Sequence, residues 1–153
     1  MERLKVRFGK PEHGWINIQI GNSMKELSLN ISYTPFHFIE ELIEAVIKIL
    51  DGESAEAHGS YNPERYEFIF KTENNIVHLQ VKSSPDHRTI EDLSEVLFDY
   101  RGNNSEVCKS FWRGFKDLEG KCSAQRFEQL FRREFPSRNL TFLSEKISAL
   151  KHS

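Results

Sequence analysis

Several features that would point to a particular class of protein are missing from this 153-residue sequence. No run of about 18 apolar residues is present, so we expect no helix that spans a membrane. Residues 1–15 contain no apolar segment of the kind that a secretory signal needs. The 2 cysteines do not form a CxxC pair, and they are too few for a disulfide framework. Together these absences predict a cytoplasmic protein.

Motifs of common catalytic and ligand-binding sites are also missing. The sequence has no GxxxxGKS, GxxxxGKT or GxGxxG phosphate loop and no GxSxG nucleophile turn. The 6 histidines lack the HxxxH and HExxH spacings of metal ligands. A nucleophilic Cys108 would need an exposed thiol beside a histidine, whereas its helical pattern is typical of a small buried residue. We therefore predict no cofactor, no metal and no catalytic residue, although the many carboxylates leave a catalytic acid pair open.

The composition is typical of one folded domain over residues 1–153. Hydrophobic residues make up 38% of the chain, charged residues make up 29%, and 12 residues are Phe. A chain of this length buries roughly two-thirds of the surface that it exposes when unfolded. Disorder is therefore not expected, because a disordered chain needs few apolar residues and a high net charge.

Alternation of apolar and polar residues predicts strands over 3–8, 15–20, 27–33, 66–72 and 76–82. The pairs Gly21-Asn22 and Asn74-Asn75 are typical of the turns between hairpin strands. Residues 93–101 fit either a helix begun at Thr89 or a strand, and their β-branched and aromatic residues favour the strand. Residues 53–64 are interpreted as a connecting loop, or as a loop that continues into an extended segment.

Helical spacing recurs in four segments. The first opens at Thr34-Pro35, where proline suits the first helical position, and ends near Gly52. Three more follow residue 104, with N-caps at Ser105, at Ser123, and at Ser137 or Thr141. The order of elements predicts an α+β fold: a mainly antiparallel sheet of five to six strands, with one crossing helix and C-terminal helices packed on one face. A parallel or non-neighbour pairing of the strands around the crossing helix stays open.

Charge is distributed unevenly along the chain. Residues 1–25 carry +3 (5 basic, 2 acidic), residues 26–99 carry −10 (5 basic, 15 acidic) and residues 100–153 carry +5 (11 basic, 6 acidic). Either the basic C-terminal part packs on the acidic middle, or the acidic middle meets a basic partner. The most distinctive polar feature is a group of five acids within fourteen residues, namely Asp86, Glu91, Asp92, Glu95 and Asp99. They form either a solubilising sheet edge or a patch that docks a cationic partner.

Aromatic residues supply the other candidate contacts. Trp112 lies at the edge of an apolar helical stripe, which favours an exposed anchor for a partner. Trp15, Tyr33 and Tyr66 mark a ligand site on the sheet face without helices. A charge of +5 over residues 100–153 is modest and argues against nucleic-acid binding. Half of the 12 Phe residues follow position 110, where core packing and a homodimer contact cannot be separated.

One further pattern spans residues 15–150. It consists of Trp15 at the start of a strand, Ser32-Tyr33 and Pro35 before an apolar helix, Pro63-Glu64 before the strand at 66–70, and Phe135-Pro136 before a Leu-rich helix. This order resembles a widespread group of small uncharacterised bacterial α+β proteins, some of which sit beside secreted toxins and are thought to act as immunity proteins. The resemblance implies a binding role, and no catalytic residue carries over from it.

These observations predict a non-enzymatic, immunity-like module that binds a protein. Its acidic surface would cover the cationic active site of a basic partner, and nucleases have such sites because they hold phosphate. The alternative is a small enzyme or ligand-binding domain whose site lies on the exposed sheet face. The two hypotheses differ in the surface that they require, which is a broad charged face for a protein and a deep polar pocket for a ligand.

Overall fold

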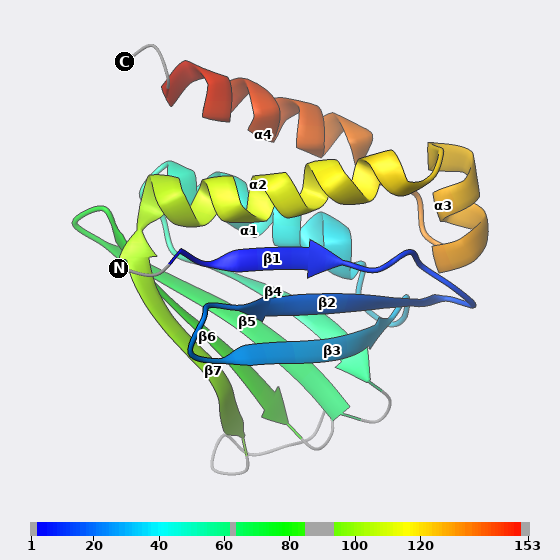
Figure 1. Cartoon of the computed structure of the whole chain (residues 1–153), viewed down its shortest axis with the longest axis horizontal. Helices are drawn as coiled ribbons and strands as arrows, with labels where there is room; N and C mark the ends of the chain where they lie inside the picture. Colours follow the sequence, from blue (N-terminus) through cyan, green and yellow to red (C-terminus); the bar gives the residue numbers. More distant parts are fainter. Residues whose placement is uncertain (1–2, 62–63, 85–93, 151–153) are drawn as a thin grey trace.

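The computed structural model describes residues 3–61, 64–84 and 94–150, which form a single sheet with helices on one side (Figure 1). Seven antiparallel strands in these ranges lie in chain order: β1 (Lys5–Phe8), β2 (Trp15–Gly21), β3 (Glu26–Ser32), β4 (Ala55–Tyr61), β5 (Glu64–Glu73), β6 (Ile76–Ser84) and β7 (Glu95–Asn103). The helices are α1 (Phe38–Leu50), α2 (Asn104–Lys121), α3 (Ala124–Phe131) and α4 (Ser137–Leu150). The predicted α+β class and antiparallel sheet are confirmed, and the sheet has seven strands instead of five to six.

The additional strand is β4, which lies in the segment that the sequence pattern assigns to a loop. Its residues are small or polar, so they lack the apolar alternation that marks the other strands. The small residues are needed for packing, because a Cβ on Gly59 would come within 2.8 Å of Ile31 Cγ2 and 3.2 Å of Phe38. The strand favoured over residues 93–101 is confirmed as β7.

The molecule has three layers, which are visible in Figure 1. The sheet buries its inner face against α1 and α2, and α4 lies over these two helices on the side away from the sheet. The short helix α3 packs beside β2. The C-terminal helices therefore lie on one side of the sheet as predicted, but only α2 covers much of it directly.

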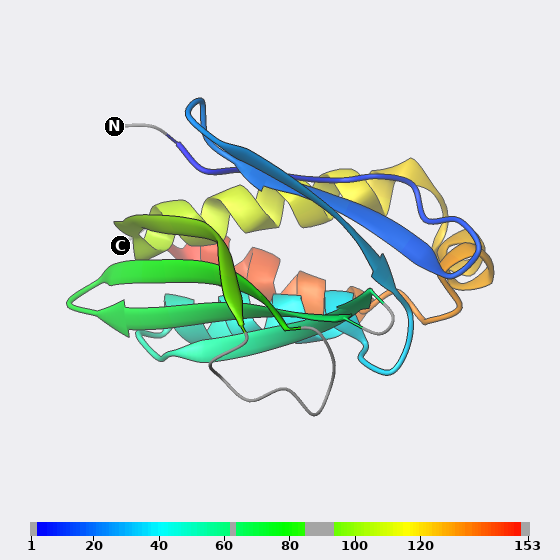
Figure 2. The same cartoon turned by 90° about the horizontal axis from the view of Figure 1, so that it is seen from below.

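The sheet is split between β3 and β4, which pair at a single position, Ser32 with Ser60. From this joint the two groups of strands diverge, so that β1–β3 run at an angle to β4–β7 (Figures 1 and 2). Helix α1 connects the two groups. It begins at Phe38 with His37 as N-cap, so it starts later than the predicted Thr34-Pro35, whose peptide bond is cis. The two strands that the sequence pattern places around the crossing helix, 27–33 and 66–72, are not neighbours, because β4 lies between β3 and β5. β3 itself pairs antiparallel with β4.

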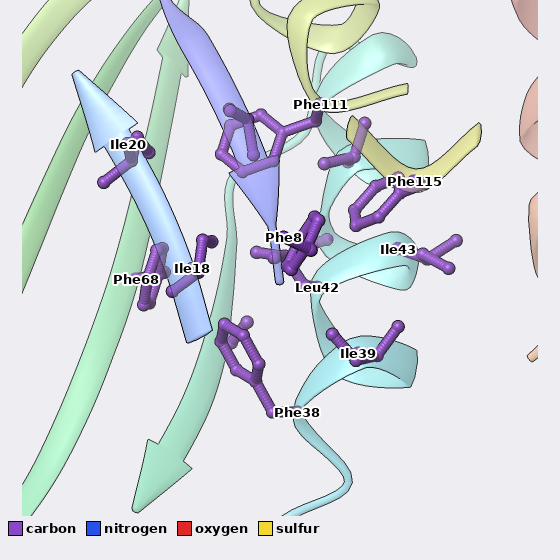
Figure 3. Close-up of a cluster of buried hydrophobic side chains, with 14 of the residues drawn as sticks. Phe8, Ile18, Ile20, Phe38, Ile39, Leu42, Ile43, Phe68, Phe111 and Phe115 are labelled. Atoms are coloured by element: carbon purple, nitrogen blue, oxygen red, sulfur yellow. The ribbon is translucent and has the colours of Figure 1, made fainter. Parts of the chain in front are cut away.

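Phenylalanine side chains fill the space between the sheet and the helices (Figure 3). Phe8 stacks on Phe115 with ring centroids 5.6 Å apart, and Phe70 meets Phe111 edge-on at 5.6 Å. Of the six Phe residues after position 110, all but Phe142 are buried within this chain. Core packing therefore accounts for five of them without a homodimer contact.

None of the described helices is long and apolar enough to cross a membrane.

Candidate functional site

The outer face of the sheet carries no helix (Figure 2). On β4–β7 the buried residues alternate with outward positions. The outward positions carry Glu56, His58, Arg65, Glu67, Ile69, Lys71, His78, Gln80, Lys82, Asp99 and Arg101. Charges of both signs therefore alternate over this face, and we call it the β4–β7 face.

Asp99 lies on the edge strand β7 of the β4–β7 face, and two neighbouring side chains fix the position of its carboxylate. Gln80 Nε2 donates to its Oδ2 at 2.9 Å, and His78 Nε2 lies 3.0 Å from its Oδ1. The hydrogen bond from Gln80 contributes most to lowering the pKa of Asp99, and the hydrogen bond from His78 contributes less. The positive charge of Arg101 acts in the same direction. The side chain is still half exposed, so an ionised carboxylate faces solvent in a fixed position.

The other acidic candidates are divided by a β-bulge. The β6–β7 register shifts between Val81 and Lys82, so that Asp99 pairs with Gln80 whereas Glu95 pairs with Ser83. Because adjacent strand positions point to opposite faces, Glu95 and Asp99 do not share a face, as a regular four-residue spacing would predict. Both side chains are exposed. Asp86, Glu91 and Asp92 lie outside the described residues.

A second polar cluster surrounds His58 on β4. Glu41 Oε1 on α1 accepts from the backbone N–H of His58 at 3.0 Å and lies 2.9 Å from its Nδ1. Glu56 Oε2 lies 3.7 Å from His58 Nε2, and Glu67 Oε1 accepts from Arg65 Nη2 at 3.1 Å. The cluster joins a helix and two strands into one charged network.

The donor atoms of Glu56, His58 and Glu67 all lie within 4.8 Å of one another. Imidazole with carboxylates is a ligand set that zinc and related ions accept, so these three are the described residues that could hold a metal. The spacing of histidines missed them because they are neighbours across β4 and β5. The available signal was the Glu-x-His pattern of 56–58, which places two side chains on the same side of a strand.

The three aromatic ligand candidates do not converge on one pocket. Trp15 is 38% exposed and meets Tyr61 edge-on with centroids 5.9 Å apart. Tyr66 is 7% exposed and lies on the same side of β5 as the core residues, where burial is the main cause of its raised pKa. Tyr33 lies beneath the guanidinium of Arg132, 5.4 Å from its ring centroid. Among the described residues, Trp15 and the unpredicted Tyr61 form an exposed aromatic pair, and the ring of Tyr61 also lies 6.3 Å from that of Tyr66.

Trp112, expected as an exposed anchor, connects two helices. Its indole Nε1 on α2 donates to Ser144 Oγ on α4 at 2.8 Å, and its side chain is half-buried against the core. The acidic middle and the basic C-terminal part also meet inside the molecule, since Lys146 on α4 forms an ion pair with Asp51 at 2.6 Å. Part of the charge asymmetry is therefore used in packing α4.

Cys108 offers no nucleophile at neutral pH. It is fully buried, its Sγ donates to the carbonyl of Val46 at 3.5 Å, and burial raises its pKa to about 12. The thiolate is the reactive form of cysteine, so this thiol stays inert unless the core opens.

Comparison with known proteins adds no further assignment. No protein-family model, no curated protein and no solved structure matches this chain. The geometry of the site therefore carries the functional argument alone.

Proposed function

We propose that this protein is a non-enzymatic, immunity-like binding module that docks a basic protein at the β7 edge of the β4–β7 face. The observation that carries the proposal is Asp99, an ionised carboxylate that is half exposed and oriented by Gln80 and His78. A charge that is oriented before binding costs little ordering entropy when a partner cation pairs with it. Such a group favours a specific partner over a non-specific cation.

The rest of the β4–β7 face supports a protein partner more than a small molecule. Its polar side chains bond to one another. Gln80 bonds to Asp99 across two strands, and Arg65 bonds to Glu67 along β5. Apart from Glu56, His58 and Glu67, whose donor atoms lie within 4.8 Å of one another, these described side chains pair with a neighbour and do not line one deep pocket, as the polar groups of a ligand site do. The alternation of Glu67 and Asp99 with Lys82 and Arg101 would restrict binding to a partner with the matching charge pattern.

A hollow on the same face is the right size for one anchoring side chain of a partner. It has a volume of about 200 Å³, and its lining includes Glu56, Ile69 and Lys71. An arginine or lysine could lay its aliphatic stem on Ile69 and pair its charged end with Glu56, whose side chain is more than half exposed. Binding hot spots are commonly side chains of this kind inserted into pockets.

Charge reversal tests the proposal. The tagged protein is used to isolate a stoichiometric partner from its host. Binding is then measured with the purified pair for E95K/D99K, which reverses both described acids of the edge strand β7, and for D99K alone, because Asp99 lies on the β4–β7 face and Glu95 does not. The matched control is D117K/E145K, which makes the same charge change on exposed helical positions of α2 and α4.

We expect E95K/D99K to weaken binding by about tenfold or more, since each lost charge-assisted bond is worth roughly 1.5–3 kcal/mol. The control should bind within about twofold of the wild type. Equal binding by both variants would show that the β7 edge is not the docking surface. Hydrogen exchange provides a second readout, because the partner should protect β6 and β7 and leave α4 unchanged.

A further inference from the structure

The other half of the outer face holds a hollow with a different character. It lies where the edge strand β1 meets the β2–β3 turn, which projects at the upper left of Figure 2. Its volume is about 340 Å³, and it is open to solvent. The polar side chains that line it include Lys5, Arg7, Gln19, Asn22, Lys25 and Glu26.

The hollow is built by the register of the hairpin. Lys5 pairs with Gly21 and Arg7 pairs with Gln19, so their side chains stand on the outer face while Val6 and Phe8 between and beside them are buried. Gly21 lies in the lining and has no side chain to fill the space. A Cβ there would lie 2.4 Å from the carbonyl oxygen of Lys25, so the turn can close over this position only because it is glycine.

The β2–β3 turn also fixes the backbone of Lys25, one of the cations that line the hollow. Asn22 Oδ1 accepts from the backbone N–H groups of Met24 and Lys25 at 2.9 and 3.0 Å, and the N–H of Asn22 donates to the carbonyl of Lys25 at 2.9 Å. The backbone of Lys25 is therefore fixed beside the hollow. The amide nitrogen of Asn22 remains a donor on the lining.

The cations of this hollow have no described ionic partner. Within the described residues, no ion pair involves Lys5, Arg7 or Lys25. The described Lys and Arg residues that do form ion pairs are Arg65, Lys116, Lys121 and Lys146. Glu26 is the acidic side chain of the lining, so three cations face one carboxylate in the hollow.

Protection of an exposed edge strand explains part of this pattern, since charged side chains discourage pairing with other chains. Such protection requires charged side chains only along β1. It does not explain why a third cation, Lys25, comes from the turn between β2 and β3 to the same hollow, or why the amides of Gln19 and Asn22 line it.

We propose that this hollow binds a ligand that carries two or more phosphate groups. The planar guanidinium of Arg7 offers paired N–H donors that match two phosphate oxygens. Lys5 and Lys25 lie nearer the turn than Arg7, and their ammonium groups act as point charges. A single phosphate would leave one of the cations without a partner. This site is separate from the β7 edge, so it stands whether or not a protein docks there.

Two sources can present such phosphates, namely a free polyphosphate or nucleotide and the backbone of a single-stranded nucleic acid. Both present closely spaced anionic oxygens, and both depend on salt because binding releases counterions. They differ in length, since an oligonucleotide would continue along the outer face of β2 and β3 beyond the hollow.

The test measures binding of sodium tripolyphosphate by calorimetry at low ionic strength. The variant is R7Q/K25Q, and the matched control is K48Q/R113Q, which removes the same charge from exposed positions on α1 and α2. All four side chains are exposed, so urea unfolding should confirm that both variants are as stable as the wild type.

We expect tripolyphosphate to bind with one site per chain, R7Q/K25Q to weaken it by about tenfold or more, and the control to change it by less than about twofold. A labelled oligothymidylate, followed by anisotropy, then identifies the source. Binding that depends on Arg7 and is displaced by tripolyphosphate assigns the site to a nucleic-acid backbone, with a log–log salt slope of about −2 for three contacts. Binding of tripolyphosphate without the oligonucleotide assigns it to a free polyphosphate.

Two results would overturn the proposal. The first is the absence of saturable tripolyphosphate binding to the folded wild type. The second is an equal loss of binding in R7Q/K25Q and in the control, because it would show general attraction to positive charge. Neither result affects the docking experiment with E95K/D99K, so the two proposals fail independently.

Discussion

Glu41 replaces a missing strand partner for His58. The backbone N–H of His58 faces the gap in which β3 has already diverged from β4, and it donates to Glu41 Oε1 at 3.0 Å instead of to a neighbouring strand. The same oxygen lies 2.9 Å from His58 Nδ1. A carboxylate from the crossing helix thus closes the sheet at the point where the two groups of strands diverge.

Removal of this carboxylate should destabilise the protein. We expect Glu41→Ala to lower the free energy of unfolding by about 1–2 kcal/mol, because a backbone donor loses its partner at a partly buried site. Glu40→Ala is the control, since Glu40 is in the same helix turn and makes only a long contact of 3.8 Å with His37. Urea unfolding measures both, and equal losses would contradict the role given to Glu41.

The stability contributed by Asp99 should depend on pH. Its pKa is lower in the folded protein than in the unfolded chain, so its stabilisation is present above the unfolded pKa and is lost as the pH falls through the folded one. The difference in unfolding free energy between wild type and Asp99→Asn should therefore be present at about pH 5 and should shrink below about pH 4.

Urea unfolding at a series of pH values measures this difference. Glu95→Gln provides the comparison on the same strand. A difference for Asp99→Asn that is unchanged at pH 3 would show that the contacts of Asp99 with Gln80 and His78 do not favour its ionised form.

The two cysteines should differ in reactivity. Burial raises the pKa of Cys108 to about 12, whereas Cys122 is half-buried at the end of α2. We expect iodoacetamide at pH 8 to modify Cys122 in the folded protein and to modify Cys108 only after denaturant is added. Mass spectrometry of the peptides distinguishes the two sites, and rapid native labelling of Cys108 would show that the core around it opens readily.

The sequence predicts the architecture better than it predicts the surface. Apolar periodicity finds the strands and helices that bury large side chains, because burial imposes that periodicity. It fails at β4, where Ala57 and Gly59 are buried because they are small. It also places Trp112 at the edge of its stripe but cannot show that Ser144 accepts from it, because that contact joins two helices far apart in the chain.

The candidate sites also depend on contacts that the pattern of residues along the chain does not show. The sequence identifies Asp99 as one of a group of acids, but its orientation by Gln80 comes from the β6–β7 register. The bulge that separates Glu95 from it leaves no clear trace in the pattern of residues. The hollow at Arg7 is likewise a product of pairing, since Lys25 reaches it through a turn and not through spacing along β1.

Two glycines provide a direct test of why β4 has no large side chains. Gly59→Ala adds a methyl group 2.8 Å from Ile31 Cγ2 and 3.2 Å from Phe38, both of which are buried. We expect it to lower the free energy of unfolding by about 1–3 kcal/mol, the usual cost of overpacking a core. Gly120→Ala in α2 meets no atom within 4 Å and should instead raise stability by about 0.5–1 kcal/mol, because alanine favours the helix.

Urea unfolding of both variants compares the same chemical change at a packed and at an open position. Opposite signs would support the view that close approach of β4 to Ile31 and Phe38 requires glycine at position 59. If Gly59→Ala were as stable as the wild type, β3 and α1 would have to move apart without cost at this joint. The joint would then be looser than its packing indicates, and Glu41 would carry more of the connection between the two groups of strands.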